Sequence, residues 1–143
     1  MKGTINEGLI LKPNLQADKF TVDIYVDAAF ASGWGTELGT NPDSVKSRTG
    51  YIIEGMGCPV IWCSKLQPCI ATSTMESEYT ALSMSLRAAI PLMVVTEAIN
   101  KGLKFAHPSL LTFKATVHED NMGTLRLVQL EPGELLLVLS FMP

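Results

Sequence analysis

A long helical pattern between two strand-like segments limits the folds that this chain can adopt. Its apolar residues recur at helical spacing and predict one core-facing side, made of Met75, Tyr79, Leu82, Leu86 and Ile90. Pro91 is expected to kink or end this first segment, and residues 91–103 continue as a second helical piece closed by Gly102. Two strands joined through such a crossover usually pair in parallel. The pattern therefore predicts an α/β fold with a mixed sheet.

Four segments have the alternation, or the β-branched and aromatic content, of strands. They are Phe20–Val26, Thr49–Glu54, Pro59–Ser64 and Leu111–Glu119. Residues 55–57, Gly-Met-Gly, favour a hairpin turn between the second and third segments. The first three segments are close enough in sequence to form an antiparallel meander, and the fourth is expected to add a parallel strand. Residues 33–48 are expected to form a polar loop.

Composition indicates one folded domain. The 143 residues are 47% hydrophobic and 17% charged, which excludes a disordered chain. No continuous apolar run approaches the roughly 20 residues that span a bilayer, and the N-terminus lacks the apolar centre of a signal peptide, so we expect no membrane partner. The cysteines, expected to be reduced, fit no zinc spacing and are interpreted as small core residues: Cys58, Cys63 and Cys69. A net charge of −3 with scattered cations argues against a tight nucleic-acid binder that acts alone.

Two aspartates stand where predicted strands end. Asp27 follows the first strand and Asp120 follows the fourth, and both fall out of phase with the apolar, core-facing residues of their strands. If these strands are parallel neighbours, both carboxylates lie at the carboxyl edge of the sheet, where open α/β sheets place their sites. Only small residues follow Asp27 before Phe30, which would leave room for a bulky polymeric substrate.

The start of the predicted helix offers a third carboxylate. Its two glutamates, Glu76 and Glu78, point about 200° apart around a helix axis. Ser73 and Glu76 form a capping box, which gives Glu76 a local role. Glu78 has no such role and flanks the predicted apolar side, so it is the better candidate to face the sheet.

Three carboxylates in one place would repel one another unless a cation lies between them. Ligands that are all oxygen suit Mg²⁺ or Mn²⁺ better than zinc. In two-metal sites such a cluster holds ions about 4 Å apart that activate a water and stabilise the leaving oxygen of a phosphodiester. The pattern thus predicts a metal site made of Asp27, Glu78 and Asp120.

Three stretches of the chain resemble a known family in order and spacing. They are YVDAAFASGW (25–34), SRTGYIIEGMGCPVIWCSKLQPCIATSTMESEYTAL (47–82) and HEDN (118–121). Together they resemble the ribonuclease H domain of copia-type LTR-retrotransposon polyproteins. The resemblance implies a ribonuclease H-like domain over residues 20–133, preceded by a connector from a reverse transcriptase over residues 1–19.

The resemblance also implies an activity. Members of the family are hydrolases, endonucleases that use two Mg²⁺ ions to cut the RNA strand of an RNA–DNA hybrid during reverse transcription. The family's first acid, helix glutamate and third acid fall on Asp27, Glu78 and Asp120, which would be both catalytic and metal-binding. The partners implied are the hybrid and the reverse transcriptase of the same polyprotein. The implied location is a cytoplasmic virus-like particle, with the nucleus as the alternative.

The end of the chain departs from the family. The family carries a fourth acid, but no Asp or His follows Asp120 here, and Glu131 and Glu134 lie in no matching motif. Residues 134–143, ELLLVLSFMP, form an apolar tail that fits a strand, a short helix or neither, and it indicates a frameshift or premature end in a decayed element. The terminal helix of the fold is expected to be missing and ion binding to be weak. A non-catalytic remnant of a retrotransposon polyprotein is therefore the alternative to an impaired nuclease.

Other polar and aromatic residues have more than one interpretation. Gly33, Gly35 and Gly39 have the wrong spacing for a dinucleotide fingerprint and precede no apolar helix. His118 is expected to be a solvated histidine at a strand edge, with an approach to the site as the alternative. Trp62 alternates with core residues and is interpreted as packing. Trp34 lies beside Asp27 in sequence, and a contact with substrate stays open.

Overall fold

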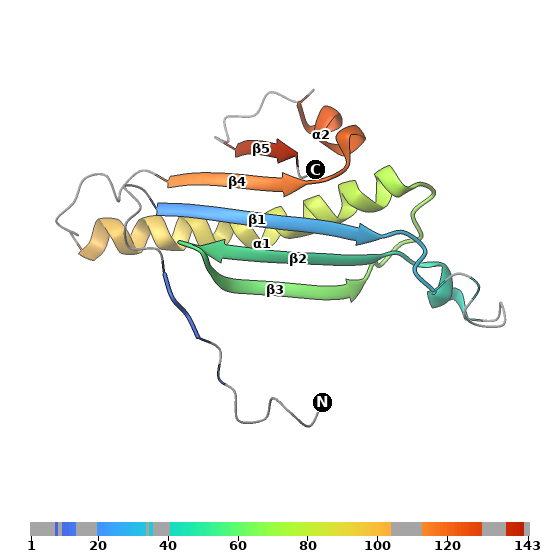
Figure 1. Ribbon diagram of the computed structural model, residues 1–143, viewed down its shortest axis with the longest axis horizontal. Helices are drawn as coiled ribbons and strands as arrows, with labels where there is room; N and C mark the ends of the chain where they lie inside the picture. The colour runs from blue at the N-terminus through green and yellow to red at the C-terminus, as the bar shows by residue number, and fades with distance from the viewer. Residues whose placement is uncertain are drawn as a thin grey trace.

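Five strands form one sheet in the computed structural model, which describes residues 8, 10–13, 20–33, 35, 41–103, 113–129 and 137–141. The strands are β1 (Phe20–Ala29), β2 (Arg48–Gly55), β3 (Cys58–Leu66), β4 (Phe113–Glu119) and β5 (Leu137–Phe141), in the spatial order β3-β2-β1-β4-β5. The helices are the 3₁₀ turn η1 (Pro42–Val45), α1 (Thr74–Leu103) and α2 (Met122–Gln129). α1 packs along one face of the sheet against β1, β2 and β4 (Figure 1).

The strand directions confirm the predicted mixed sheet. β1 pairs antiparallel with β2, and β2 pairs antiparallel with β3, as a meander requires. Met56 and Gly57 both have positive φ (55° and 76°) and make the predicted hairpin turn between β2 and β3. After the α1 crossover, β4 pairs parallel with β1. This arrangement is compatible with a ribonuclease H-like fold.

The apolar tail supplies a fifth strand. Residues 137–141 form β5, which pairs parallel with β4 at the edge of the sheet. A strand, a short helix or neither were the alternatives for this tail, and residues 137–141 form a strand. The proposed connector lies mostly outside the described residues, so the division of the chain at residues 19 and 133 stays a prediction.

α1 does not break at its proline. It is one helix of 30 residues with Pro91 inside it, so of the two alternatives for this position an end of the helix is wrong. Proline removes one backbone N–H and crowds one carbonyl, which leaves the other helical hydrogen bonds available. Residues on both sides of Pro91, including Ala88, Ala89, Leu92 and Met93, pack against the sheet and hold the helix together.

The buried side of α1 matches the predicted one in part: Leu82 is buried and Leu86 packs against the core, whereas the other three predicted residues are exposed. Met75, Tyr79 and Ile90 are 40%, 50% and 40% exposed. The residues that face the sheet are instead mostly small: Ser77, Glu78, Ala81, Leu82, Ser85 and Ala89. Small side chains allow the helix axis to approach the sheet closely, so a stripe of alanine and serine faces inward. Glu78 lies on this stripe.

The hydrophobic core lies between α1 and the sheet. β1 contributes Val22, Ile24, Val26 and Ala28, and β4 contributes Ala115 and Val117, which confirms the alternation expected for both strands. Of the cysteines, all free thiols, Cys58 is buried as expected, whereas Cys63 is half-buried and Cys69 is exposed.

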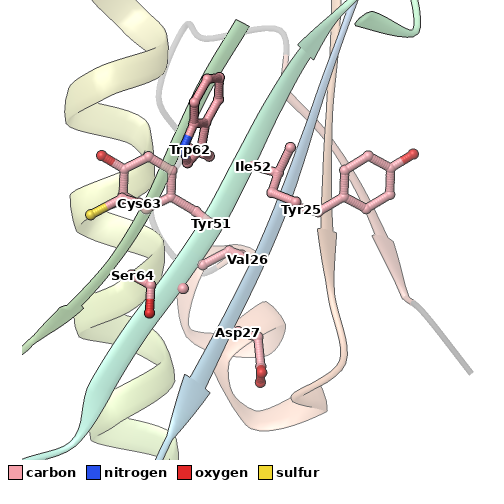
Figure 2. Close-up of a pocket in the computed structure, with 9 residues that line it drawn as sticks. Tyr25, Val26, Asp27, Tyr51, Ile52, Trp62, Cys63 and Ser64 are labelled. Carbon is pink, nitrogen blue, oxygen red and sulfur yellow. The ribbon is translucent and has the colours of Figure 1, made fainter. Parts of the chain in front are cut away.

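Trp62 is on the other face of the sheet, where it is 64% exposed, so its interpretation as core packing is wrong. It pairs across β2 and β3 with Ile52, which is also exposed, whereas its neighbour Ile61 packs against the core. A pocket of about 450 Å³ opens beside Trp62 (Figure 2). It is lined by Tyr25, Val26, Asp27, Gly50, Tyr51, Ile52, Trp62, Cys63 and Ser64.

α1 is long and apolar enough to cross a membrane by length and composition. The stretch Thr74–Ile99 has 26 residues and contains an 18-residue window with a mean hydropathy of 1.5. The prediction from sequence concerned continuous apolar runs, and serine, threonine, glutamate and arginine residues interrupt this stretch. Helices that pack on a sheet in soluble proteins pass the same test, so this property alone is weak evidence of a span.

Candidate metal centre

The site lies where β4 ends beside β1. The parallel pairing of these strands runs from Phe20 and Phe113 to Tyr25 and His118, while β1 itself continues to Ala29. Because the chain leaves β4 after Glu119 and turns into α2, the last residues of β1 lie beyond the pairing with β4. The first turn of α1 approaches the sheet at this opening.

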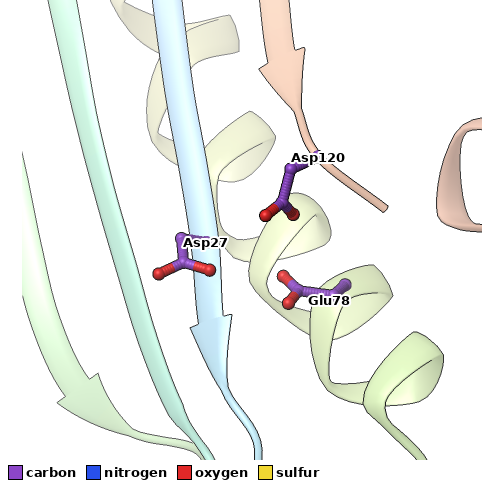
Figure 3. Close-up of side chains that lie close together, drawn as sticks. All are labelled: Asp27, Glu78 and Asp120. Atoms are coloured by element: carbon purple, nitrogen blue, oxygen red, sulfur yellow. The ribbon is translucent and has the colours of Figure 1, made fainter. Parts of the chain in front are cut away.

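Three carboxylates meet there. One oxygen from each of Asp27, Glu78 and Asp120 lies within 4.8 Å of the other two. The side chains come from β1, from α1 and from the residue that follows β4, and they point into one shared space (Figure 3). The predicted proximity of these three carboxylates is therefore found in the structure.

Glu76 stays outside this cluster and caps the helix. Ser73 Oγ accepts a hydrogen bond from the Glu76 backbone N–H (3.1 Å), as in a capping box. The Glu76 carboxylate reaches one residue further back than expected and accepts hydrogen bonds from the backbone N–H of Thr72 (2.7 Å) and from its hydroxyl (2.6 Å). These bonds lower the pKa of Glu76, so it is a charged cap.

Glu78 is the buried member of the cluster, with 7% of its surface exposed. Burial, followed by the negative charges of Glu119, Asp27 and Asp120, raises the pKa of Glu78 to about 8, against a hydrogen bond from the Ala28 backbone N–H that lowers it. Its Oε2 has no hydrogen-bond partner among the described residues. Without a compensating cation, Glu78 is therefore largely protonated at neutral pH.

Glu119 is a fourth carboxyl beside the cluster, and the sequence analysis missed it. It is fully buried, and burial raises its pKa to about 7 although the Asn121 backbone N–H donates to Oε1 (3.1 Å). Its Oε2 also has no partner in the described part of the chain. The signal was present, because Glu119 continues the inward phase of Ala115 and Val117.

Asp120 is held in place by the residue that follows it. Asn121 Oδ1 accepts hydrogen bonds from the backbone N–H groups of Gly123 (2.9 Å) and Thr124 (3.1 Å), so Asn121 caps α2. The Thr124 hydroxyl donates to the carbonyl of Met75 in the first turn of α1 (3.4 Å). The chain therefore turns immediately after Asp120, with α2 fixed to the helix that carries Glu78.

His118 is bonded on the outer face of the sheet and is not a member of the three-carboxylate cluster. Its Nε2 lies 3.1 Å from Asp23 Oδ1, and its ring stacks on Tyr25 with centroids 4.4 Å apart and an interplanar angle of 9°. Trp34, the other aromatic candidate for a substrate contact, lies outside the described residues.

The donor set fits a hard divalent cation. All of the candidate ligand atoms are carboxylate oxygens, and Mg²⁺ binds oxygen at about 2.1 Å, which places ligands on opposite sides of the ion about 4.2 Å apart. The 4.8 Å spread of the three oxygens is close to this value. Within the described residues, Oε2 of the buried Glu78 has no hydrogen-bond partner, and a bound cation would satisfy it.

Comparison with known proteins places the chain near retrotransposon polyproteins. No protein-family model and no solved structure matches it. A curated protein that it resembles in part is the Retrovirus-related Pol polyprotein from transposon TNT 1-94 of Nicotiana tabacum, with 51% identity over 39 residues. The alignment covers 27% of this chain and 3% of the tobacco protein, so the chain spans a small fraction of that relative. The match supports a retrotransposon origin.

Proposed function

We propose that this protein is a metal-dependent nuclease of the ribonuclease H type, which cleaves the RNA strand of RNA–DNA hybrids as part of a retrotransposon polyprotein. The observation that carries the proposal is the convergence of one oxygen each of Asp27, Glu78 and Asp120 within 4.8 Å, where Glu78 is buried and its Oε2 has no hydrogen-bond partner among the described residues. The mixed sheet and the partial match to a retrotransposon Pol polyprotein agree with it.

The three carboxylates would have different roles in the proposed site. Asp27 and Asp120 are exposed and offer oxygens toward solvent, where a polymeric substrate can approach. Glu78 closes the site from the protein side and would lose its proton when a cation arrives. Mg²⁺ bound to such a set supplies a more acidic water and stabilises charge on the leaving oxygen. The impaired activity that we expect follows from the small number of acidic ligands.

The second candidate is a non-catalytic remnant that binds metal or hybrid weakly. It is favoured by one observation: within the described residues, the group of carboxylates close enough to hold an ion has three members, and Glu119 lies beside this group without belonging to it.

Cleavage of a labelled RNA–DNA hybrid in Mg²⁺ and in Mn²⁺ separates the two candidates. We expect weak cleavage of the RNA strand alone, lost in Asp27→Asn and Asp120→Asn and retained in Glu76→Gln, because Glu76 caps the helix outside the cluster. Cleavage that survives in Asp27→Asn would contradict the proposal. Metal binding without any cleavage would favour the remnant.

A further inference from the structure

A buried glutamine connects the strands to the start of α1. Gln67 follows β3 and is 2% exposed. Its side-chain Nε2 donates to the carbonyl of Ser77 (2.8 Å) and to the Thr49 hydroxyl (3.1 Å). Its backbone N–H donates to the carbonyl of Ser47 (2.8 Å). Gln67 belongs to the SKLQP stretch, to which the proposed metal site gives no role.

The hydrogen bonds of Gln67 reach two of the elements that carry the carboxylates. Ser77, whose carbonyl accepts from Gln67, directly precedes Glu78 in α1. On the other side, Ser47 Oγ accepts from the backbone N–H of Ala31 (3.1 Å), two residues beyond the end of β1. A continuous path through Ser47 and Gln67 therefore joins the end of β1, which carries Asp27, to the first turn of α1.

The site gives a reason for such a connection. Glu78 is buried, and one of its oxygens lies within 4.8 Å of an oxygen of Asp27 and of Asp120, so the geometry of the cluster depends on what holds this part of α1 in place. The first turn of a helix has no preceding turn to hold it. Ser47, Thr49 and Ser77 are all fully buried, so none of these polar groups can exchange its partner for water without opening the interior.

We propose that Gln67 is a positioning residue, which sets the place of Glu78 relative to Asp27 through its bond to the Ser77 carbonyl and so determines the cation affinity of the cluster. The effect on cation affinity rests on the proposed function. The placement of the first turn of α1 is independent of the proposed function, because the hydrogen bonds that hold this turn involve no metal.

The test compares three variants of the full chain. Gln67→Met keeps the shape of the side chain and removes the donor. Thr49→Val removes the other acceptor and leaves the bond to Ser77. Ser85→Ala removes a buried hydrogen bond of the same helix, from its hydroxyl to the Leu82 carbonyl (2.8 Å), two turns from the site.

The measurements are Mn²⁺ affinity and amide hydrogen exchange at Glu78 and Tyr79, with circular dichroism to show that each variant is folded. We expect Gln67→Met to weaken Mn²⁺ binding about tenfold, as loss of a group that orients a ligand does, and to speed exchange at both amides. Thr49→Val and Ser85→Ala should stay within about twofold of wild type in affinity, because they keep the Ser77 bond. If Gln67→Met does not fold, Gln67→Asn, whose shorter amide cannot reach both acceptors, takes its place.

Two results would overturn the inference: unchanged exchange in Gln67→Met, or an equal effect in Thr49→Val. Failure of the proposed function gives a different result. If wild type and Asp27→Asn respond to Mn²⁺ in the same way, the metal site is wrong, and the exchange rates at Glu78 and Tyr79 still decide whether Gln67 positions the first turn.

Discussion

Glu76 and Glu78 are two positions apart on α1 and have opposite electrostatic environments. Hydrogen bonds from Thr72 lower the pKa of Glu76, which is exposed to solvent. Burial, and then the charges of the neighbouring carboxyls, raise the pKa of Glu78 to about 8. Little more than half a turn of helix thus separates a charged cap from a carboxyl that keeps its proton until a cation binds. The capping box made this assignment possible from sequence, because it gave one glutamate a local partner.

The raised pKa values of Glu78 and Glu119, about 8 and about 7, predict how stability depends on pH in the absence of metal. A carboxyl whose pKa is higher in the folded protein stabilises it most below the unfolded pKa of about 4.3, and this stabilisation is lost as pH rises through the folded value. The free energy of unfolding should therefore fall between pH 5 and pH 9, by at least about 1 kcal/mol, since one pKa unit corresponds to about 1.4 kcal/mol.

Urea unfolding at a series of pH values, with a chelator present, measures this dependence. Glu78→Gln should make the decrease in the free energy of unfolding at high pH smaller. Glu76→Gln should leave this decrease unchanged, because the pKa of Glu76 is lowered. Stability that rises between pH 6 and pH 9 in wild type would contradict the account of the buried carboxyls.

At the scale of elements, strands and their buried faces were predicted correctly where the apolar residues recur with a regular period. Alternation along β1 and β4 predicted both strands and placed Asp27 and Asp120 out of phase with the core. Glu119 has the same inward phase as Ala115 and Val117, so the alternation was enough to predict its burial. The buried side of α1 was predicted correctly for Leu82 and Leu86 and wrongly for Met75, Tyr79 and Ile90. Large apolar residues were expected to face inward throughout, whereas close packing on the sheet also selects small ones such as alanine.

Two short elements had too little pattern to be predicted. α2 has 8 residues and depends on the Asn121 cap, whose side chain bonds Gly123 and Thr124. β5 is an apolar run in which strand and helix cannot be distinguished by period, and its pairing with β4 is what makes it a strand. Tertiary contacts therefore determine the secondary structure of these two segments, which the local sequence pattern does not decide.

Substitution of two adjacent residues tests the corrected face of α1. Ala89 is fully buried and Ile90 is 40% exposed. Ala89→Leu should destabilise the protein by about 1–3 kcal/mol because the larger side chain forces the helix away from the sheet. Ile90→Ala should cost about 0.5 kcal/mol or less, as surface substitutions do. Chemical denaturation of both variants gives the comparison, and a larger loss in Ile90→Ala would restore the face first predicted from sequence.

At the scale of the whole molecule, no helix among the described residues packs on the face of the sheet away from α1 (Figure 1). Tyr25, Ile52, Val60 and Trp62 are 36%, 45%, 45% and 64% exposed there, beside the pocket that reaches Asp27. Contiguous apolar surface of this kind favours association between molecules. The same face carries Asp23, with His118 bonded to it, so it is not uniformly apolar.

We therefore expect concentration-dependent self-association through this face. The double variant Ile52→Thr, Trp62→Thr should sediment as a smaller species than wild type at the same concentration. Val94→Thr, which changes a residue on α1 that is 60% exposed, serves as the matched control and should sediment as wild type does. Association reduced by the α1 variant and unaffected by the double variant would place the contact on the helix instead.

The central claim is that Asp27, Glu78 and Asp120 together bind a divalent cation, and titration with paramagnetic Mn²⁺ followed by NMR tests it most directly. Because the three carboxylates lie within 4.8 Å of one another, amide signals of residues around all three should broaden together at low Mn²⁺. The effect should disappear in Asp27→Asn and persist in His118→Ala, since His118 is bonded to Asp23 outside the cluster. Equal broadening in the Asp27→Asn protein would contradict the claim.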